Sequence, residues 1–205
     1  MLTTQSYENS VFVNCPFDRE YWPLFEAITF AVCHCGFYPR CALEVDDSSQ
    51  VRIEKITRII KACRLSVHDI SRIETDGDPP MPRFNMPLEL GIFLGAKSFG
   101  TGEQKKKAGV VLDTEQYRYQ RYMSHIAGQD IRAHRGEPEQ IIRHVRNFLA
   151  THTPASEFLP GPDRIADRYR NFRKHLPALC RFLHLDARSL TFSDLTRLIV
   201  GYMRS

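Results

Sequence analysis

Residues 11–18 read VFVNCPFD, and this stretch indicates the type of unit, a strand followed by a helix, from which the fold is expected to be built. Its first three residues are β-branched or aromatic, which is typical of a buried strand. Polar and turn-forming residues then end the strand, and Asp18 is a candidate cap for a following helix. Apolar residues recur at helical spacing from Trp22 to Val32, and Gly36 is suited to ending a helix. We therefore expect one strand followed by one helix.

The same order of strand and helix repeats up to about residue 150. Further strands are expected at residues 37–43, 65–70, 108–112 and 130–133, and further helices at residues 49–63, 87–96, 115–126 and 138–149. A helix between successive strands is the connection that parallel strands require. We therefore predict an α/β protein with a flavodoxin-like sheet of five parallel strands in the order 2-1-3-4-5. Pro39 removes a hydrogen-bond donor from the second strand, which favours a position near an edge.

The chain changes character after residue 150. Residues 151–162 contain three prolines and few apolar side chains, which is typical of a linker. Two helical patterns follow, at residues 164–183 and 193–203. We therefore divide the chain into an α/β domain of residues 1–150 and a linker with a helical tail of residues 151–205.

The helical tail is both basic and aromatic. Its basic residues include Arg164, Arg168, Arg170, Arg173, Lys174, Arg181 and Arg188. Tyr169, Phe172, Phe182 and Leu183 are interleaved with them at helical spacing, so we expect these side chains to pack on the α/β domain or on a second copy. The basic residues are expected to form a solvated helix face, and contact with nucleic-acid phosphates is the less favoured alternative.

The composition is that of a globular protein. Hydrophobic residues make up 42% and charged residues 25%, with a net charge of +4, which disfavours disordered, collagen-like and disulfide-scaffold classes. No apolar run approaches the roughly 20 residues of a membrane span, and residues 1–10 lack the pattern of a secretory signal. The six cysteines lack the paired spacing of a zinc site, and Cys33, His34 and Cys35 cannot all point at one ion from a helix. We expect a cytoplasmic protein with buried thiols, no membrane contact, no metal and no bound cofactor.

Three segments are expected at the ligand-binding edge of the sheet. Ligands bind open parallel sheets outside the carboxyl ends of the strands, where the strand order reverses. In the predicted order this position lies between the first and third strands, which are followed by residues 14–18 and 68–71, while residues 83–91 open the next helix. The candidate site residues in these segments are Asn14, Cys15, Pro16, Phe17, Asp69, Ser71, Arg83, Asn85 and Glu89.

Glu89 is the strongest candidate for chemistry. It is expected in the first turn of a helix that starts near Pro87, between two leucines. The helix N-terminus should lower its pKa and keep it ionised, which suits a group that stabilises positive charge on a ribose while the base departs. The alternative is an ordinary acidic residue that the helix dipole alone favours.

Asp69 and His68 are neighbours at the end of the third strand and should point to opposite faces. Asp69 is a candidate to hold ribose hydroxyls or the leaving base, and its alternative role is to cap the next turn. His68 is expected to have a packing role. Asn14 and Ser71 offer neutral hydrogen bonds, and Arg83 is a candidate phosphate ligand.

Together, the three segments resemble the nucleoside 2-deoxyribosyltransferase-like group, the relatives of TIR domains within the flavodoxin-like folds. The resemblance covers residues 11 to about 133 and rests on residues 12–17 (FVNCPF), 69–71 (DIS) and 87–91 (PLELG). In that group the glutamate of the last segment is the nucleophile at the anomeric carbon, and in TIR NADases a glutamate serves the same glycosidic cleavage. The resemblance implies this role for Glu89, with NAD or a (deoxy)nucleotide as the substrate.

The resemblance also implies a homodimer or larger homo-oligomer, and it is compatible with bacterial antiphage signalling. Two other functions stay open at this point. The first is a nucleotide-sensing or interaction module that binds without turnover and passes a signal through its helical tail. The second, less favoured, is a nucleic-acid-associated protein.

Overall fold

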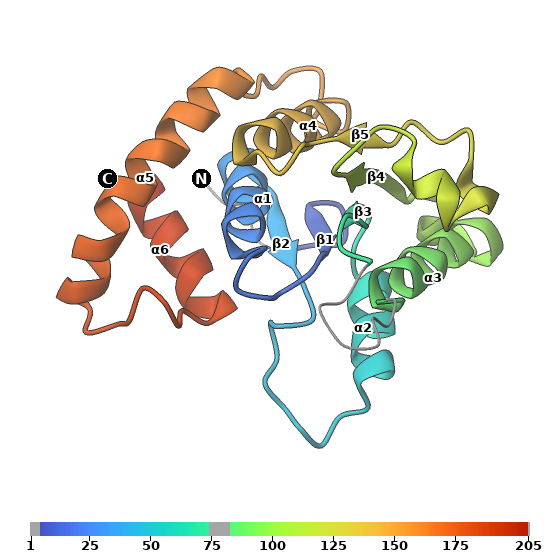
Figure 1. The fold of residues 1–205 in the computed structure, drawn as a ribbon, viewed down its shortest axis with the longest axis horizontal. Coiled ribbons are helices and arrows are strands. Elements are labelled where there is room, and N and C mark those ends of the chain that lie inside the picture. Colours follow the sequence, from blue (N-terminus) through green and yellow to red (C-terminus); the bar gives the residue numbers. More distant parts are fainter. Residues whose placement is uncertain (1–4, 74–82, 205) are drawn as a thin grey trace.

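Five parallel strands form one sheet in the computed structural model, which describes residues 5–73 and 83–204. The strands are β1 (Ser10–Asn14), β2 (Tyr38–Arg40), β3 (Leu65–Asp69), β4 (Ala108–Asp113) and β5 (Arg132–Ala133). Their order across the sheet is β2-β1-β3-β4-β5, which confirms the predicted flavodoxin-like α/β fold (Figure 1). The proline-bearing β2 lies at an edge, as expected.

The register of the strands brings their carboxyl ends to one edge of the sheet. Val13 of β1 is paired with Val67 of β3, and Val67 is paired in turn with Val110 of β4. Both β1 and β3 are buried along their whole length, because helices cover the two faces of the sheet. The strands β1, β3 and β4 end in Asn14, Asp69 and Asp113, and these polar residues therefore meet at the same edge, which is the one predicted to bind ligands.

The helices form one layer on each face of the sheet. One face carries α1 (Trp22–His34) and α4 (Pro138–Ala150), and the other carries α2 (Arg52–Lys61) and α3 (Asn85–Phe99) (Figure 1). The helix α3 begins two residues before Pro87, where the sequence had predicted its start. Asp18 does not cap α1 directly, because its carboxylate accepts a hydrogen bond from the amide of Tyr21, one residue before the helix begins.

The helix predicted over residues 115–126 is wrong. The chain there forms two short 3-10 helices, η2 (Arg118–Arg121) and η3 (Ser124–Ile126). A further 3-10 helix, η1 (Gly102–Lys106), precedes β4. Tyr117 has a φ of 66°, in the left-handed region that a continuing α-helix cannot use. The side chain of Arg118 turns back to the carboxylate of Asp113, so local polar contacts replace the polar, aromatic helix that the sequence suggested.

The C-terminal helices α5 (Pro162–Phe182) and α6 (Phe192–Arg204) pack against α1 and share its hydrophobic core. The rings of Tyr169 and Phe172 each lie 5.4 Å from that of Phe30, which confirms the packing predicted for these two residues. Phe182, whose side chain is 82% exposed, and Leu183, which is also exposed, do not pack on the α/β domain, and their packing on a second copy stays a prediction. In the described part of the chain, no helix combines the length and apolar character needed to cross a membrane.

A buried polar contact joins α5 to α1. The hydroxyl of Tyr169 donates a hydrogen bond of 2.9 Å to the carboxylate of Glu26, which is 3% exposed, and Arg173 lies 3.3 Å from the same carboxylate. Apart from this residue and Thr29, the stretch from Phe25 to Cys33 is apolar, and all of it is buried. The helix α1 is thus enclosed on every side, by the sheet, by α4 and by the tail.

Candidate functional site

Asn14 and His68 lie where β1 and β3 end, at the predicted ligand-binding edge. The Asn14 amide donates a hydrogen bond of 2.8 Å to the carbonyl of Met86 in α3, and its nitrogen lies 2.9 Å from Nδ1 of His68. Because an amide group donates there, His68 accepts at Nδ1 and carries its proton at Nε2. Burial lowers the pKa of His68 to about 3, with a smaller contribution from Lys107. The pair therefore fixes the start of α3 against the sheet, and His68 has a packing role.

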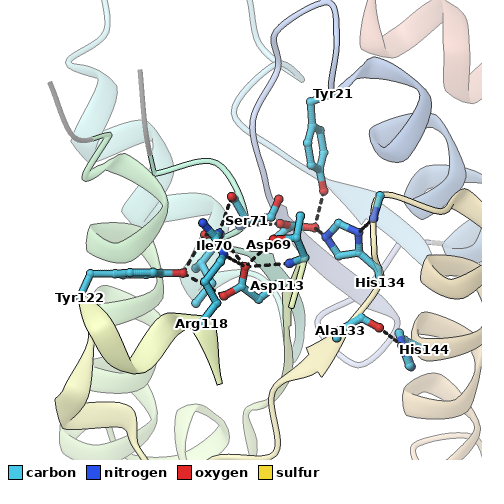
Figure 2. Close-up of polar contacts among 12 residues, drawn as sticks. Tyr21, Asp69, Ile70, Ser71, Asp113, Arg118, Tyr122, Ala133, His134 and His144 are labelled. Atoms are coloured by element: carbon cyan, nitrogen blue, oxygen red, sulfur yellow. Dashed lines mark hydrogen bonds and ion pairs between the residues drawn. The ribbon is translucent and has the colours of Figure 1, made fainter. Parts of the chain in front are cut away.

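Asp69 is the fully buried centre of a polar network on the other face of β3 (Figure 2). Its carboxylate accepts hydrogen bonds from the hydroxyl of Tyr21, at 2.6 Å, and from the amide of Ser71, at 2.8 Å. Nε2 of His134 lies 3.1 Å from the same carboxylate, and the amide of Gly136 donates to Nδ1 of that ring. Burial alone would raise the pKa of Asp69, but the contacts of His134, Ser71 and Tyr21 outweigh it and the pKa is lowered. The ionised carboxylate is thus satisfied by the protein itself.

A second carboxylate, Asp113, lies at the corresponding end of β4 and was not predicted (Figure 2). Arg118 contacts its Oδ1 through Nε at 2.9 Å and Nη2 at 2.6 Å, and the hydroxyl of Tyr122 donates to Oδ2 at 2.9 Å. Arg118 also donates to the carbonyl of Ser71, so the network connects the ends of β3 and β4. The one available signal was an aspartate directly after an apolar strand, the same signal that singled out Asp69.

Glu89 is buried, with 8% of its surface exposed, on the face of α3 that also carries Met86 and Leu90. The predicted lowering of its pKa is wrong. Because α3 begins at Asn85, Glu89 lies in the second turn, beyond the free amides of the helix start. Burial instead raises its pKa to about 7, and the positive charge of Arg52 opposes the shift only in part. Within residues 5–73 and 83–204, its carboxylate has no hydrogen-bond or ion-pair partner.

Cys15 lies within electrostatic range of both carboxylates. Burial has the largest effect on the pKa of its thiol and raises it, and the charges of Asp69 and Glu89 add to that increase. Pro16 is also buried, and Phe17 packs edge-on against Phe25 with ring centres 5.2 Å apart. The hydrogen bonds from Asn14 to Met86 and from Arg83 to Asp18 show that the segments after β1 and before α3 meet at one edge.

The remaining predicted residues lie nearer the surface or have partners already. Arg83 donates to the carboxylate of Asp18 at 2.9 Å, so it links the segment before α3 to the loop after β1. Asn85 is exposed, whereas Ser71 is buried and its hydroxyl has no hydrogen-bond partner within the described chain. Two cavities of about 850 and 620 Å³ lie elsewhere, beside α6.

The side chains at this edge include one carboxylate with a lowered pKa, Asp69, and one with a raised pKa, Glu89. All six cysteines are buried thiols outside any disulfide. Among the described residues, no group of three His, Cys, Asp or Glu side chains is arranged to hold a metal ion. The described residues thus offer Glu89 as an acidic group without a hydrogen-bond or ion-pair partner, beside the polar network around Asp69. Comparison of the chain with protein-family models, with curated proteins and with solved structures found no match.

Proposed function

We propose that this protein cleaves the N-glycosidic bond of NAD or of a (deoxy)nucleotide at the carboxyl edge of its sheet, with Glu89 as the catalytic carboxylate. The observation that carries the proposal is the environment of Glu89. It is a buried acid, 8% exposed, with its pKa raised to about 7 and with no partner in the described chain. An ordinary surface glutamate of a helix has neither the burial nor the shift.

An unpaired buried carboxylate binds a positive charge more strongly than a neutral group. Removing Glu89 from water disfavours its ionised form, and a cation that enters the site restores that form. Cleavage of an N-glycosidic bond develops positive charge on the sugar in the transition state. The carboxylate therefore stabilises the transition state more than the substrate, which is the requirement for catalysis.

The chemical step is a substitution at the anomeric carbon. The bond from C1′ to the base nitrogen breaks, and the base leaves with the bonding electrons. Glu89 stabilises the sugar cation or bonds to C1′, and an acceptor oxygen or nitrogen then attacks C1′ and loses its proton. Water as the acceptor gives hydrolysis, and a second base gives exchange.

Asp69 is assigned to positioning within this proposal. Its oxygens already contact Tyr21, Ser71 and His134, so direct contact with the substrate would displace one of these groups. Asp69 lies within electrostatic range of Cys15. The residue before Cys15 is Asn14, which binds the carbonyl of Met86 in α3, so the network supports the position of α3. Arg83 and Arg52 are the nearby cations that are proposed to meet the phosphates of the substrate.

The test is release of free base from NAD and from a panel of (deoxy)nucleotides, followed by chromatography. Glu89→Gln should lose about a hundredfold or more of the rate. Glu54→Gln is the matched control, because Glu54 is exposed in the first turn of α2, and its rate should equal that of the unmodified protein. Equal rates in Glu89→Gln and Glu54→Gln would refute the assignment.

The pH dependence sharpens the same test. A raised pKa means that Glu89 is mostly protonated below about pH 7 and mostly ionised above it. The rate of base release should therefore rise between pH 6 and pH 8, with a midpoint near 7. A rate that is flat over this range would show that ionisation of Glu89 does not control the step.

A non-catalytic nucleotide-binding module is the second candidate, because Asn14, Asp69 and Arg83 all have partners within the protein. Nucleotide binding without base release would support it, and salt-sensitive binding of DNA or RNA alone would support a nucleic-acid role. A cytoplasmic location is also proposed, because six buried free thiols are typical of a reducing compartment.

A further inference from the structure

The cavity of about 620 Å³ lies at the opposite end of the sheet from Glu89. It is lined by residues just before β1 and β3, by the end of α1, by the linker before α5 and by α6. The α/β domain contributes Arg64 and His34 to its wall, and the helical tail contributes Arg168 and Arg204. Its volume falls in the range of small-molecule sites, about 300 to 1,000 Å³. The cavity therefore belongs jointly to the domain and the tail.

The cationic groups of this wall are incompletely paired. Arg168 stacks on the ring of Tyr202, with 5.7 Å to the ring centre, but within the described chain it makes no hydrogen bond or ion pair. Arg204 likewise has no such partner among the residues described. Arg64 donates to the carbonyl of His152 at 3.2 Å and lies 3.1 Å from the exposed carboxylate of Glu8, so a bound phosphate would take the place of that carboxylate. Two unpaired guanidinium groups thus face one remaining acid, Glu157, around the cavity.

Two buried polar atoms of the wall also lack partners. Nδ1 of His34 and Nε of Arg64 are each shielded from solvent, and neither has a hydrogen-bond partner in the part of the chain that the structure describes. A buried donor or acceptor without a partner costs free energy unless a ligand or water meets it. Burial lowers the pKa of His34, and the positive charge of Arg168 lowers it further. The charge of Arg168 therefore acts at the wall of the cavity.

We propose that this cavity binds a small phosphate monoester of about nucleoside size, held by Arg168 and Arg204 from the tail and by Arg64 from the α/β domain. A phosphate monoester carries nearly two negative charges and three terminal oxygens, so several guanidinium groups can share it. Phe37, Phe158 and Met203 line the same cavity and provide apolar surface for the organic part. Phe158 is 95% exposed, and contact with the ligand would cover part of its ring.

The site would couple ligand binding to the docking of the tail. Its groups come from both sides of the contact between α1 and the helical tail, so a ligand that meets all of them stabilises that contact. It lies at the opposite end of the sheet from the residues after β1 and β3, so it is independent of the proposed glycosidic site.

The experiment is isothermal titration calorimetry with adenosine 5′-monophosphate, inorganic phosphate and uncharged adenosine. Adenosine 5′-monophosphate should bind, and adenosine should bind at least about tenfold more weakly. Arg168→Ala and Arg204→Ala should each weaken binding of the monophosphate about tenfold or more. Arg181→Ala, on the same helix as Arg168 but outside the cavity, should bind as the unmodified protein does.

Two further variants separate this site from the proposed glycosidic site. Glu89→Gln should leave binding of the monophosphate unchanged, and Phe158→Ala should weaken the monophosphate but not inorganic phosphate. Circular dichroism checks that each variant is folded, and the exposed Arg204 provides a test that does not depend on the half-buried Arg168. No binding of either anion, or equal binding by Arg168→Ala, Arg204→Ala and the unmodified protein, would overturn the proposal. Loss of binding only in Glu89→Gln would place the anion at the carboxyl edge instead.

Discussion

Asp69 and Glu89 are two carboxylates at the same edge of the sheet, both withdrawn from solvent, yet their surroundings are opposite. The oxygens of Asp69 are contacted by Tyr21, Ser71 and His134, and its pKa is lowered. Glu89 has no such donor in the described chain, and burial raises its pKa to about 7. We infer from this contrast that Asp69 stabilises the fold, whereas Glu89 can interact with a ligand.

Burial alone therefore does not identify a functional acid. What distinguishes the two groups is whether the protein supplies the hydrogen bonds that a buried charge requires. A satisfied carboxylate stabilises the folded state, whereas an unsatisfied one costs stability and is retained at functional sites. Stability measurements can therefore test the comparison without knowledge of the substrate.

The largest effect is expected for Asp69→Asn. The amide places a donor where Tyr21, Ser71 and His134 already point donors, so we expect a loss of about 3 kcal/mol in the free energy of unfolding at pH 7. Urea denaturation measures it. Tyr21→Phe removes one hydrogen bond only and should cost about 1 kcal/mol. Asp130→Asn is the matched control at an exposed position and should be neutral.

The pH dependence of Asp69→Asn has a defined sign. The pKa of Asp69 is lower in the folded than in the unfolded state, so its contribution is present above the unfolded pKa of about 4 and is lost as pH falls through the folded pKa. The difference between Asp69→Asn and the unmodified protein should therefore shrink below pH 4. A difference that stays constant down to pH 2 would mean that the charge of Asp69 is not the stabilising group.

Glu89→Gln should have a smaller effect of opposite direction. The folded pKa of about 7 exceeds the ordinary value of 4.5, so ionisation of Glu89 costs stability as pH rises from 4.5 to 7 and the full cost applies above 7. The variant should be more stable than the unmodified protein by about 1 to 3 kcal/mol at pH 8. The two should be nearly equal at pH 4.

Thermal unfolding at both pH values measures the effect of Glu89→Gln, with the exposed Glu54→Gln as the control. If Glu89→Gln is destabilised at pH 8, then the carboxylate is satisfied after all. In that case the contrast with Asp69 no longer holds.

The smallest effect is expected for Arg83→Ala. Its ion pair with Asp18 at 2.9 Å is partly exposed, so screening by water limits its contribution to below about 1 kcal/mol. The same variant should weaken binding of NAD if Arg83 meets a phosphate of the substrate. Calorimetric titration with NAD, beside urea denaturation, distinguishes these two effects. A large loss of stability without a change in affinity would assign Arg83 to the frame around Asp69.

The sequence was sufficient to predict the strands and their order, because the apolar runs are short and helices separate most of them; the exception is the helix expected between the fourth and fifth strands. It also brought Asp69 and Glu89 to one edge, since parallel strands share the side on which they end. The pKa of Glu89 could not be predicted, because a shift of two residues in the start of α3 moves it away from the free helix amides.

The partners of Asp69 could not be predicted from the sequence, because they come from distant segments of the chain. Tyr21 comes from the turn before α1 and His134 from the end of β5, and no local pattern connects either residue to β3. The polar, aromatic segment around Arg118 was predicted to be a helix, but Tyr117 is left-handed there and Arg118 contacts Asp113. Contacts that close the network across the sheet require the three-dimensional structure.

The enclosed helix α1 has a consequence for how the chain is made. This helix ends at His34, but the helices that cover its outer side begin only at Pro162. During synthesis on the ribosome, the outward-facing apolar side of α1 is therefore without its cover until translation has passed α5 and α6. Such a nascent chain is a natural substrate for chaperones. Truncation of the protein before α5 would leave the apolar side of α1 exposed to solvent and would promote aggregation.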